Sequence, residues 1–142
     1  MNIGMAKKPP KIVLDTNILI SALIYGGKPE KIYNLVLDKQ LISVTSPILL
    51  SELTEILIKK FKFELSRIKR LEKIIKNNFI IVNPSKIISL LKDDDDNRVL
   101  EAAIEGKCTY IVTGDSDLLD LVNFKNIKIA TPDVFLSNLL ID

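Results

Sequence analysis

Histidine and tryptophan are both missing from this sequence of 142 residues. Without histidine, the chain has no Ser-His-Asp triad, no Cys-His pair and no histidine-ligated zinc site. A single cysteine, Cys108, excludes an intramolecular disulfide and a cysteine-rich metal cluster. Aromatic residues make up only 6% of the chain, so aliphatic side chains have to fill the core. The side chains left for chemistry are mainly the carboxylates, 18 in all.

Long hydrophobic runs are also missing, since no stretch approaches the roughly 18 apolar residues that span a bilayer. Residues 1–10 contain two lysines and two prolines but no apolar signal core, and we interpret them as a flexible N-terminal lead-in. We expect a single domain over residues 11–142, because the composition is ordinary for a globular protein. A cytoplasmic location is expected, and the single thiol agrees with it.

The net charge of +2 hides two segments of opposite sign. Lys59–Lys76 holds eight basic and two acidic residues, whereas Asp93–Asp120 holds nine acidic and two basic residues. A basic flank beside an acidic centre suits an enzyme that holds a polyanion and cuts it with metal ions. Taken alone, the same pattern is also typical of a solvated helix and a solvated loop.

Short apolar runs alternate with amphipathic segments along the chain. The predicted strands cover residues 11–15, 41–45, 79–82, 109–113 and 127–130. The predicted helices cover residues 17–24, 29–38, 46–60, 66–78, 85–91, 96–105, 117–122 and 132–140. The strands are continuous apolar runs, as expected where helices cover both faces of a sheet. We therefore predict a three-layer α/β/α domain with a mostly parallel sheet of about five strands.

Two of these strands end in aspartate, at the edge where open parallel sheets form their sites. Asp15 closes the first strand, and Asp115 follows the fourth strand, with Asp117 two residues further on. A single aspartate at the end of a strand is often only a helix N-cap. Two such positions at one edge favour a functional site.

Helical geometry, at about 100° per residue, brings in two further carboxylates. In the third predicted helix, Glu52 lies at the border of the apolar stripe, with an exposed glutamate as the alternative, and Glu55 points to solvent. In the helix after the four-aspartate run, Asp96 points into the apolar stripe, Asp94 points away, and Asp95 is a candidate N-cap. A carboxylate aimed at a core is costly, and neighbouring carboxylates raise one another's proton affinity. A divalent cation relieves both effects.

The carboxylates Asp15, Glu52, Asp96 and Asp115 stand in motifs that resemble those of the PIN-domain nucleases. The first two motifs are Val13–Asn17, with Asp-Thr-Asn, and Ser51–Leu57, with Glu52 on the helix. The other two are Asp95–Asn97, followed by Leu-Glu-Ala-Ala, and Tyr110–Leu119, with Thr-Gly-Asp. Four motifs in the right order make a specific signal. The chain is most similar to the branch of VapC-like toxins of toxin–antitoxin pairs, which commonly has proline at the position of Asp94.

The resemblance implies a Mg²⁺- or Mn²⁺-dependent endoribonuclease, and both ions prefer carboxylate oxygens. It implies RNA as the substrate, a small antitoxin protein as a partner, and a homodimer. It assigns catalysis and metal binding to Asp15, Glu52, Asp96 and Asp115, adds Asp117 as a metal ligand, and places Asn17, Thr113 and Ser116 around them. The departure at Asp94 leaves open whether Asp95 shares the role of Asp96.

The basic segment offers contacts to an RNA backbone, which position a substrate without specifying its sequence. The candidate residues are Lys59, Lys60, Lys62, Arg67 and Lys69.

Two other aspartate-based folds fit less well. A haloacid-dehalogenase-like phosphatase needs a second aspartate where this chain has Asn17, and a response-regulator receiver needs an aspartate after the third strand, where Asn83 and Pro84 follow. The alternatives that stay open are a non-catalytic PIN-like module that binds RNA or protein, and an RNA-processing nuclease outside a toxin–antitoxin system.

Overall fold

The computed structural model describes residues 8–141, so the first seven residues of the predicted lead-in lie outside the described residues. The strands are β1 (Lys11–Leu14), β2 (Ile42–Thr45), β3 (Ile80–Ile81), β4 (Tyr110–Val112), β5 (Asn123–Phe124) and β6 (Ile127–Ala130). The helices are α1 (Thr16–Ile24), α2 (Gly27–Leu37), α3 (Pro47–Lys59), α4 (Leu65–Asn78), α5 (Asp94–Glu105), α6 (Ser116–Leu119) and α7 (Pro132–Ile141). Within residues 8–141, no helix is both long and apolar enough to cross a membrane.

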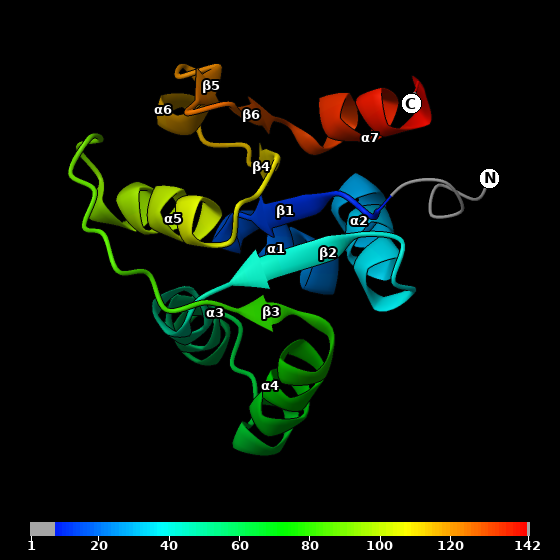
Figure 1. The fold of residues 1–142 in the computed structure, drawn as a ribbon. Coiled ribbons are helices and arrows are strands. Elements are labelled where there is room, and N and C mark those ends of the chain that lie inside the picture. The colour runs from blue at the N-terminus through cyan, green and yellow to red at the C-terminus, as the bar shows by residue number, and fades with distance from the viewer. Residues whose placement is uncertain (1–7, 142) are drawn as a thin grey trace.

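The six strands form one sheet in the order β3-β2-β1-β4-β6-β5, parallel except for β5, which pairs antiparallel with β6 (Figure 1). The chain moves outward from β1 through β2 and β3, then crosses back to β4 on the other side of β1. The direction of winding therefore reverses between β1 and β4. Open α/β sheets place their binding sites at such a switch point, beyond the carboxyl ends of the strands.

Alternate side chains of the sheet enter two separate cores. Ile12 and Leu14 pack in one core with side chains of α1, α2, α3, α4 and α7, whereas Val13 packs in the other with side chains of α5 and α6. This alternation follows from the two-residue repeat of a strand. Helices thus cover both faces of a mostly parallel sheet, and the predicted three-layer architecture is confirmed (Figure 1).

Two parts of the predicted secondary structure are wrong. The sheet has six strands, because a two-residue strand, β5, precedes β6 as a short hairpin. Residues 85–91, predicted as a helix, form an irregular segment that we call the strap. Side chains of α5 hold the strap: Glu101 accepts a hydrogen bond from the Ile88 N–H at 2.8 Å, and Glu105 accepts one from the Ser85 N–H at 2.9 Å. These bonds hold the backbone of the strap against α5.

Candidate metal centre

The centre begins where β1 and β4 end side by side. Leu14 of β1 is in register with Val112 of β4, so Asp15 and Thr113 are the next residues on adjacent strands. The Thr113 hydroxyl donates a hydrogen bond to Asp15 Oδ2 at 2.7 Å and accepts one from the Asp115 N–H at 3.0 Å. Thr113 is fully buried. One threonine therefore orients both the carboxylate after β1 and the turn that carries Asp115.

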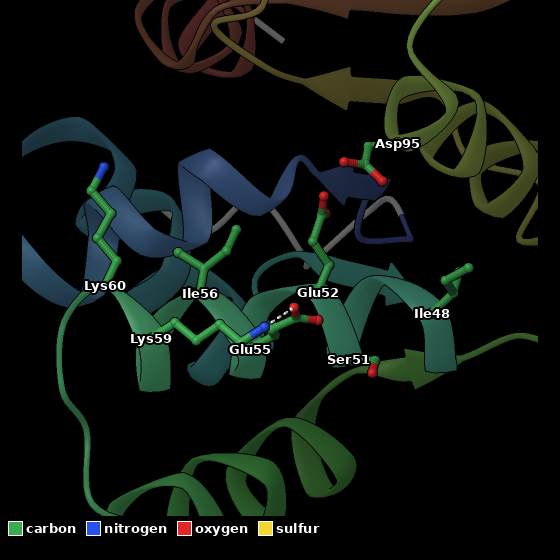
Figure 2. A pocket seen from close by; sticks show the side chains of 8 residues that line it. All are labelled: Ile48, Ser51, Glu52, Glu55, Ile56, Lys59, Lys60 and Asp95. Carbon is green, nitrogen blue, oxygen red and sulfur yellow. Dashed lines mark hydrogen bonds and ion pairs between the residues drawn. The ribbon is translucent and has the colours of Figure 1, made fainter.

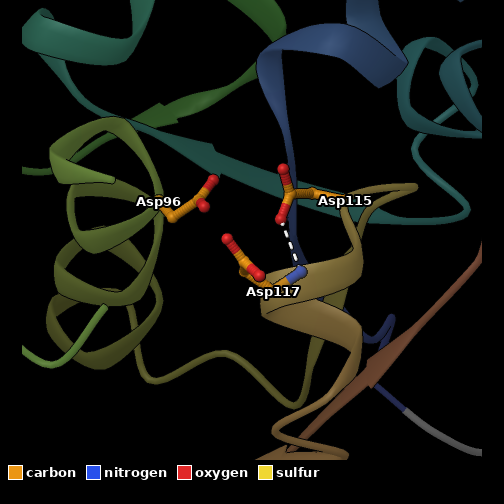
Figure 3. A group of neighbouring side chains, drawn as sticks. All are labelled: Asp96, Asp115 and Asp117. Atoms are coloured by element: carbon orange, nitrogen blue, oxygen red, sulfur yellow. Dashed lines mark hydrogen bonds between the residues drawn. The ribbon is translucent and has the colours of Figure 1, made fainter. Parts of the chain in front are cut away.

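Three aspartates meet beside this pair. Asp96 from the first turn of α5 and Asp115 and Asp117 from the start of α6 turn toward one another (Figure 3). One carboxylate oxygen of each lies within 4.8 Å of the others. Asp115 Oδ1 also accepts hydrogen bonds from the N–H groups of Asp117, at 2.9 Å, and of Leu118, at 3.2 Å. Asp115 is thus both a helix N-cap and a member of the cluster, so the capping alternative does not exclude a site.

The ionised forms of Asp96 and Asp15 are unfavourable in this position. Burial is the largest cause that raises the pKa of Asp96, and together with the charges of Asp115, Asp93, Asp15 and Asp117 it brings this pKa to about 7. Burial also raises the pKa of Asp15, the hydrogen bond from Thr113 opposes that rise, and the charge of Asp115 adds to it. Asp96 is only 5% exposed, yet its Oδ2 has no hydrogen-bond partner among the described residues.

Glu52 enters the centre from α3, on the other side of Asp15. The hydroxyl of Thr16, the first residue of α1, donates a hydrogen bond to Glu52 Oε1. Burial, together with neighbouring Asp95 and Asp15, raises the pKa of Glu52 to about 7, against the opposing effect of that hydrogen bond. Figure 2 shows Glu52 and Asp95 facing each other. Asp15 therefore links Glu52 and Asp95 on one side to Asp96, Asp115 and Asp117 on the other.

We use "carboxylate cluster" for these six side chains: Asp15, Glu52, Asp95, Asp96, Asp115 and Asp117. The angular predictions for α3 and α5 agree with the structure. Asp96 is buried and Asp94 exposed, while Glu52 is half-buried and Glu55 exposed. The prediction of Asp95 as a helix N-cap is wrong, because Asp93 Oδ1 accepts a hydrogen bond from the Asp95 N–H at 2.9 Å. Its side chain is thereby free to turn toward Glu52.

The predicted surrounding residues divide into two kinds. Thr113 bonds directly to the cluster, whereas Asn17 and Ser116 lie exposed in the first turns of α1 and α6. Among the described residues, neither the Asn17 side chain nor the Ser116 hydroxyl forms a hydrogen bond to the six carboxylates, whereas a backbone hydrogen bond from Asn17 lowers the pKa of Asp15. Thr16 was missed by the sequence analysis. Its signal was its place between Asp15 and Asn17, at the first position of a helix that starts at the sheet edge.

The donor set fits a hard divalent cation. Every side chain of the carboxylate cluster offers oxygen, the preferred ligand of Mg²⁺ and Mn²⁺. Within residues 8–141, no hydrogen bond compensates the burial of Asp96 Oδ2. A bound cation would supply a partner for this oxygen and stabilise the ionised form of several crowded acids. The carboxylate cluster therefore fits the divalent cation, Mg²⁺ or Mn²⁺, that the sequence predicted.

A cleft of about 480 Å³ adjoins the cluster and runs along α3 (Figure 2). Glu52 and Asp95 line it at one end, and Lys59 and Lys60 line it further along α3. Lys59 forms an ion pair with Glu55 at 2.7 Å. The basic segment continues from the cleft into α4 with further exposed cations, among them the predicted RNA-binding residues Lys62, Arg67 and Lys69.

The fold and this geometry agree with the comparison to known proteins. Residues 11–117 match the PIN domain family, and the chain belongs to that family. PIN domains are typically metal-dependent nucleases, so the carboxylate cluster has the composition that the family leads one to expect. The chain is similar to the uncharacterized protein MJ1680 of Methanocaldococcus jannaschii, with 34% identity over an alignment of 145 residues that covers 93% of each chain.

Proposed function

We propose that this protein is a metal-dependent endoribonuclease that cuts RNA at the carboxylate cluster. The observation that carries the proposal is that the acid after β1 and acids from α3, α5 and the β4–α6 turn act on one another at the switch point of the sheet. These acids are far apart in the sequence, and each is costly to hold ionised in this position. Such an arrangement is best explained by a bound cation that stabilises the ionised carboxylates.

In this proposal Asp15, Glu52, Asp96 and Asp115 are the catalytic acids that also hold Mg²⁺ or Mn²⁺, with Asp117 as a further ligand. When bound, the ion supplies the Lewis acidity that promotes deprotonation of a water and stabilises the leaving oxygen. Thr113 keeps Asp15 Oδ2 oriented, and Thr16 does the same for Glu52 Oε1. This chemistry requires no protein base, which agrees with a chain that has no histidine.

The basic segment has the role of holding the RNA. Lys59 and Lys60 line the cleft that leads to the cluster, and Lys62, Arg67 and Lys69 extend the positive surface beyond it. Phosphate contacts of this kind fix the position of the chain without reading its sequence. The proposal therefore predicts tight, salt-sensitive binding with little base preference from these five residues.

A cytoplasmic toxin of a toxin–antitoxin pair is the more specific form of the proposal. It rests on the resemblance to VapC-like toxins, and it adds a small antitoxin protein and a homodimer. Expression of the wild-type chain alone would then arrest growth, the Asp15→Asn variant would not, and a small protein encoded next to it would relieve the arrest. Active cleavage without arrest would favour an RNA-processing nuclease, and RNA binding without cleavage would favour a non-catalytic module.

RNA cleavage by the purified protein tests the core of the proposal. We expect cleavage with Mg²⁺ or Mn²⁺, inhibition by EDTA, and near-complete loss in Asp15→Asn. Asp38→Asn is the matched control, since Asp38 is exposed and precedes β2, at the opposite end of the sheet. Undiminished cleavage by Asp15→Asn would refute the assignment of the site.

A further inference from the structure

An exposed tyrosine stands at the end of α1. Tyr25 is 75% exposed, directly after the last residue of the helix. The other two tyrosines are covered, because Tyr33 is buried and Tyr110 packs edge-on against Phe135 at a centroid distance of 4.9 Å. Tyr25 therefore leaves most of its aromatic surface in water, and at least one face of its ring is open.

The ring of Tyr25 is nevertheless held in place. Phe61, which follows α3, packs against it at a centroid distance of 6.4 Å and an interplanar angle of 76°. Phe61 is itself half-buried against the core formed by α1, α3 and α4. Lys60 Nζ lies 5.6 Å from the Phe61 ring centre. Tyr25 thus packs against a phenylalanine ring that also has a lysine cation near it.

The ring lies at the far end of a pair of helices that starts at the carboxylate cluster. Thr16 at the start of α1 bonds to Glu52 of α3, and Tyr25 at the end of α1 packs on Phe61 just after α3. The two helices therefore run side by side away from the cluster. Nine residues separate Thr16 from Tyr25, a helical rise of about 13 Å. Lys60, next to Phe61, lines the cleft that contains Glu52 and Asp95 (Figure 2).

We propose that Tyr25 is a stacking platform for an unpaired base of the RNA. Lys60 binds a backbone phosphate that lies between that base and the cleaved phosphodiester bond. This inference rests on the proposed function and adds the substrate form: the strand is unpaired where it leaves the cluster along α3. Bases have an exposed π-face only when they are unstacked, and aromatic side chains recognise single strands through that face. The ring selects for unpaired bases, whereas the lysines accept any phosphate.

Fluorescence tests this directly, since the chain has no tryptophan. In the full chain carrying Asp15→Asn to prevent cleavage, Tyr25→Trp introduces a single tryptophan at the platform. We expect an oligouridylate to quench its emission. A strand of the same length that lacks bases but keeps its phosphates, and a blunt RNA duplex, should leave the emission unchanged. Quenching by the baseless strand would overturn the proposal.

Affinity provides the second readout. In the same Asp15→Asn background, Tyr25→Leu should weaken oligouridylate binding about tenfold, while Tyr25→Phe should keep it. Equal affinities of the leucine and tyrosine forms would refute stacking. These binding measurements need no cleavage, so stacking without activity would defeat only the nuclease proposal, and activity without stacking would defeat only this inference. A change of emission with protein concentration alone, without an RNA effect, would assign the ring to a protein interface instead.

Discussion

Asp96 shows most clearly how the site lowers the stability of the metal-free protein. Its side chain is almost fully buried, four other aspartates raise its pKa, and one of its oxygens has no partner among the described residues. Functional sites commonly hold such unfavourable groups at the expense of stability. Relief of this cost should therefore stabilise the metal-free protein while removing its activity.

We predict that Asp96→Asn raises the melting temperature of the protein in EDTA at pH 8 by about 2–5 °C. The pKa of Asp96 is about 7 in the folded protein, above its ordinary value of 3.8. The folded state therefore binds more protons between these values, and the free energy of unfolding falls as pH rises from about 4 to 7. Thermal denaturation at pH 5 and pH 8 measures the effect, which should shrink at pH 5.

Asp38→Asn serves as the control for this measurement and should leave the melting temperature nearly unchanged at both values of pH. An Asp96→Asn protein that is less stable than the wild type at pH 8 in EDTA would mean that the carboxylate stabilises the fold, contrary to the account.

At the scale of elements, α5 does two jobs at once. Its first turn delivers Asp95 and Asp96 to the carboxylate cluster, and its side chains bind the strap that leads into it. Asn97 forms a pair of hydrogen bonds with Leu91, accepting from the N–H and donating to the C=O, both at 2.8 Å. Glu101 accepts from the Ile88 N–H and pairs with Arg98 at 2.8 Å. The side chains of α5 therefore position the strap.

We predict that Asn97→Ala destabilises the protein by about 1–3 kcal/mol, because it leaves the N–H and C=O of Leu91 without partners in a partly buried place. Chemical denaturation measures the loss, and hydrogen exchange should show faster exchange of the Leu91 amide. Asn77→Ala, an exposed asparagine on α4, is the control and should change stability little. Unchanged Leu91 exchange in Asn97→Ala would contradict this role of α5.

At the scale of the whole molecule, the topology gathers opposite charges around one edge of the sheet. The switch point between β1 and β4 holds the carboxylate cluster, and α3 leads from it to the basic segment. A polyanion that binds the basic segment is thereby held close to acids that it would otherwise avoid. Binding should then depend strongly on salt, since lysine–phosphate contacts release counterions.

We predict that Lys59→Ala together with Lys60→Ala weakens single-stranded RNA binding and lowers the slope of log K against log salt by about 1.4. The Asp15→Asn background prevents cleavage during the titration. The matched control is the pair Lys125→Ala and Lys128→Ala, exposed residues of the β5–β6 hairpin at the other edge of the sheet. The same slope in both double variants would remove the cleft lysines from the binding surface.

The sequence was most informative where one local rule decides the outcome. Continuous apolar strands that alternate with amphipathic helices predicted the layers, because a strand that is apolar along its whole length needs helices on both faces of the sheet. Asp15 and Asp115 could be brought together because parallel strands share their carboxyl edge, and Asp96 because its angle on a helix follows from residue spacing. The part that each acid plays in chemistry is a separate question, to which the experiments above are directed.

Local rules failed where distant side chains decide. Residues 85–91 carry apolar residues at a spacing that a helix allows, but Glu101, Glu105 and Asn97 capture their backbone groups. The bond between Thr16 and Glu52 joins residues 36 positions apart, and no spacing within one element predicts it. The approach of Asp95 to Glu52 likewise depends on how α5 and α3 pack, which only the tertiary structure determines.

Direct measurement of Mn²⁺ binding tests the central claim, that the carboxylate cluster forms one metal site. Electron paramagnetic resonance distinguishes free from bound Mn²⁺ in titrations of the wild type, Asp96→Asn and Asp38→Asn. The account predicts that the wild type and Asp38→Asn bind Mn²⁺ alike, with Mg²⁺ competing, and that Asp96→Asn binds it far more weakly. Equal Mn²⁺ binding by all three proteins would contradict it.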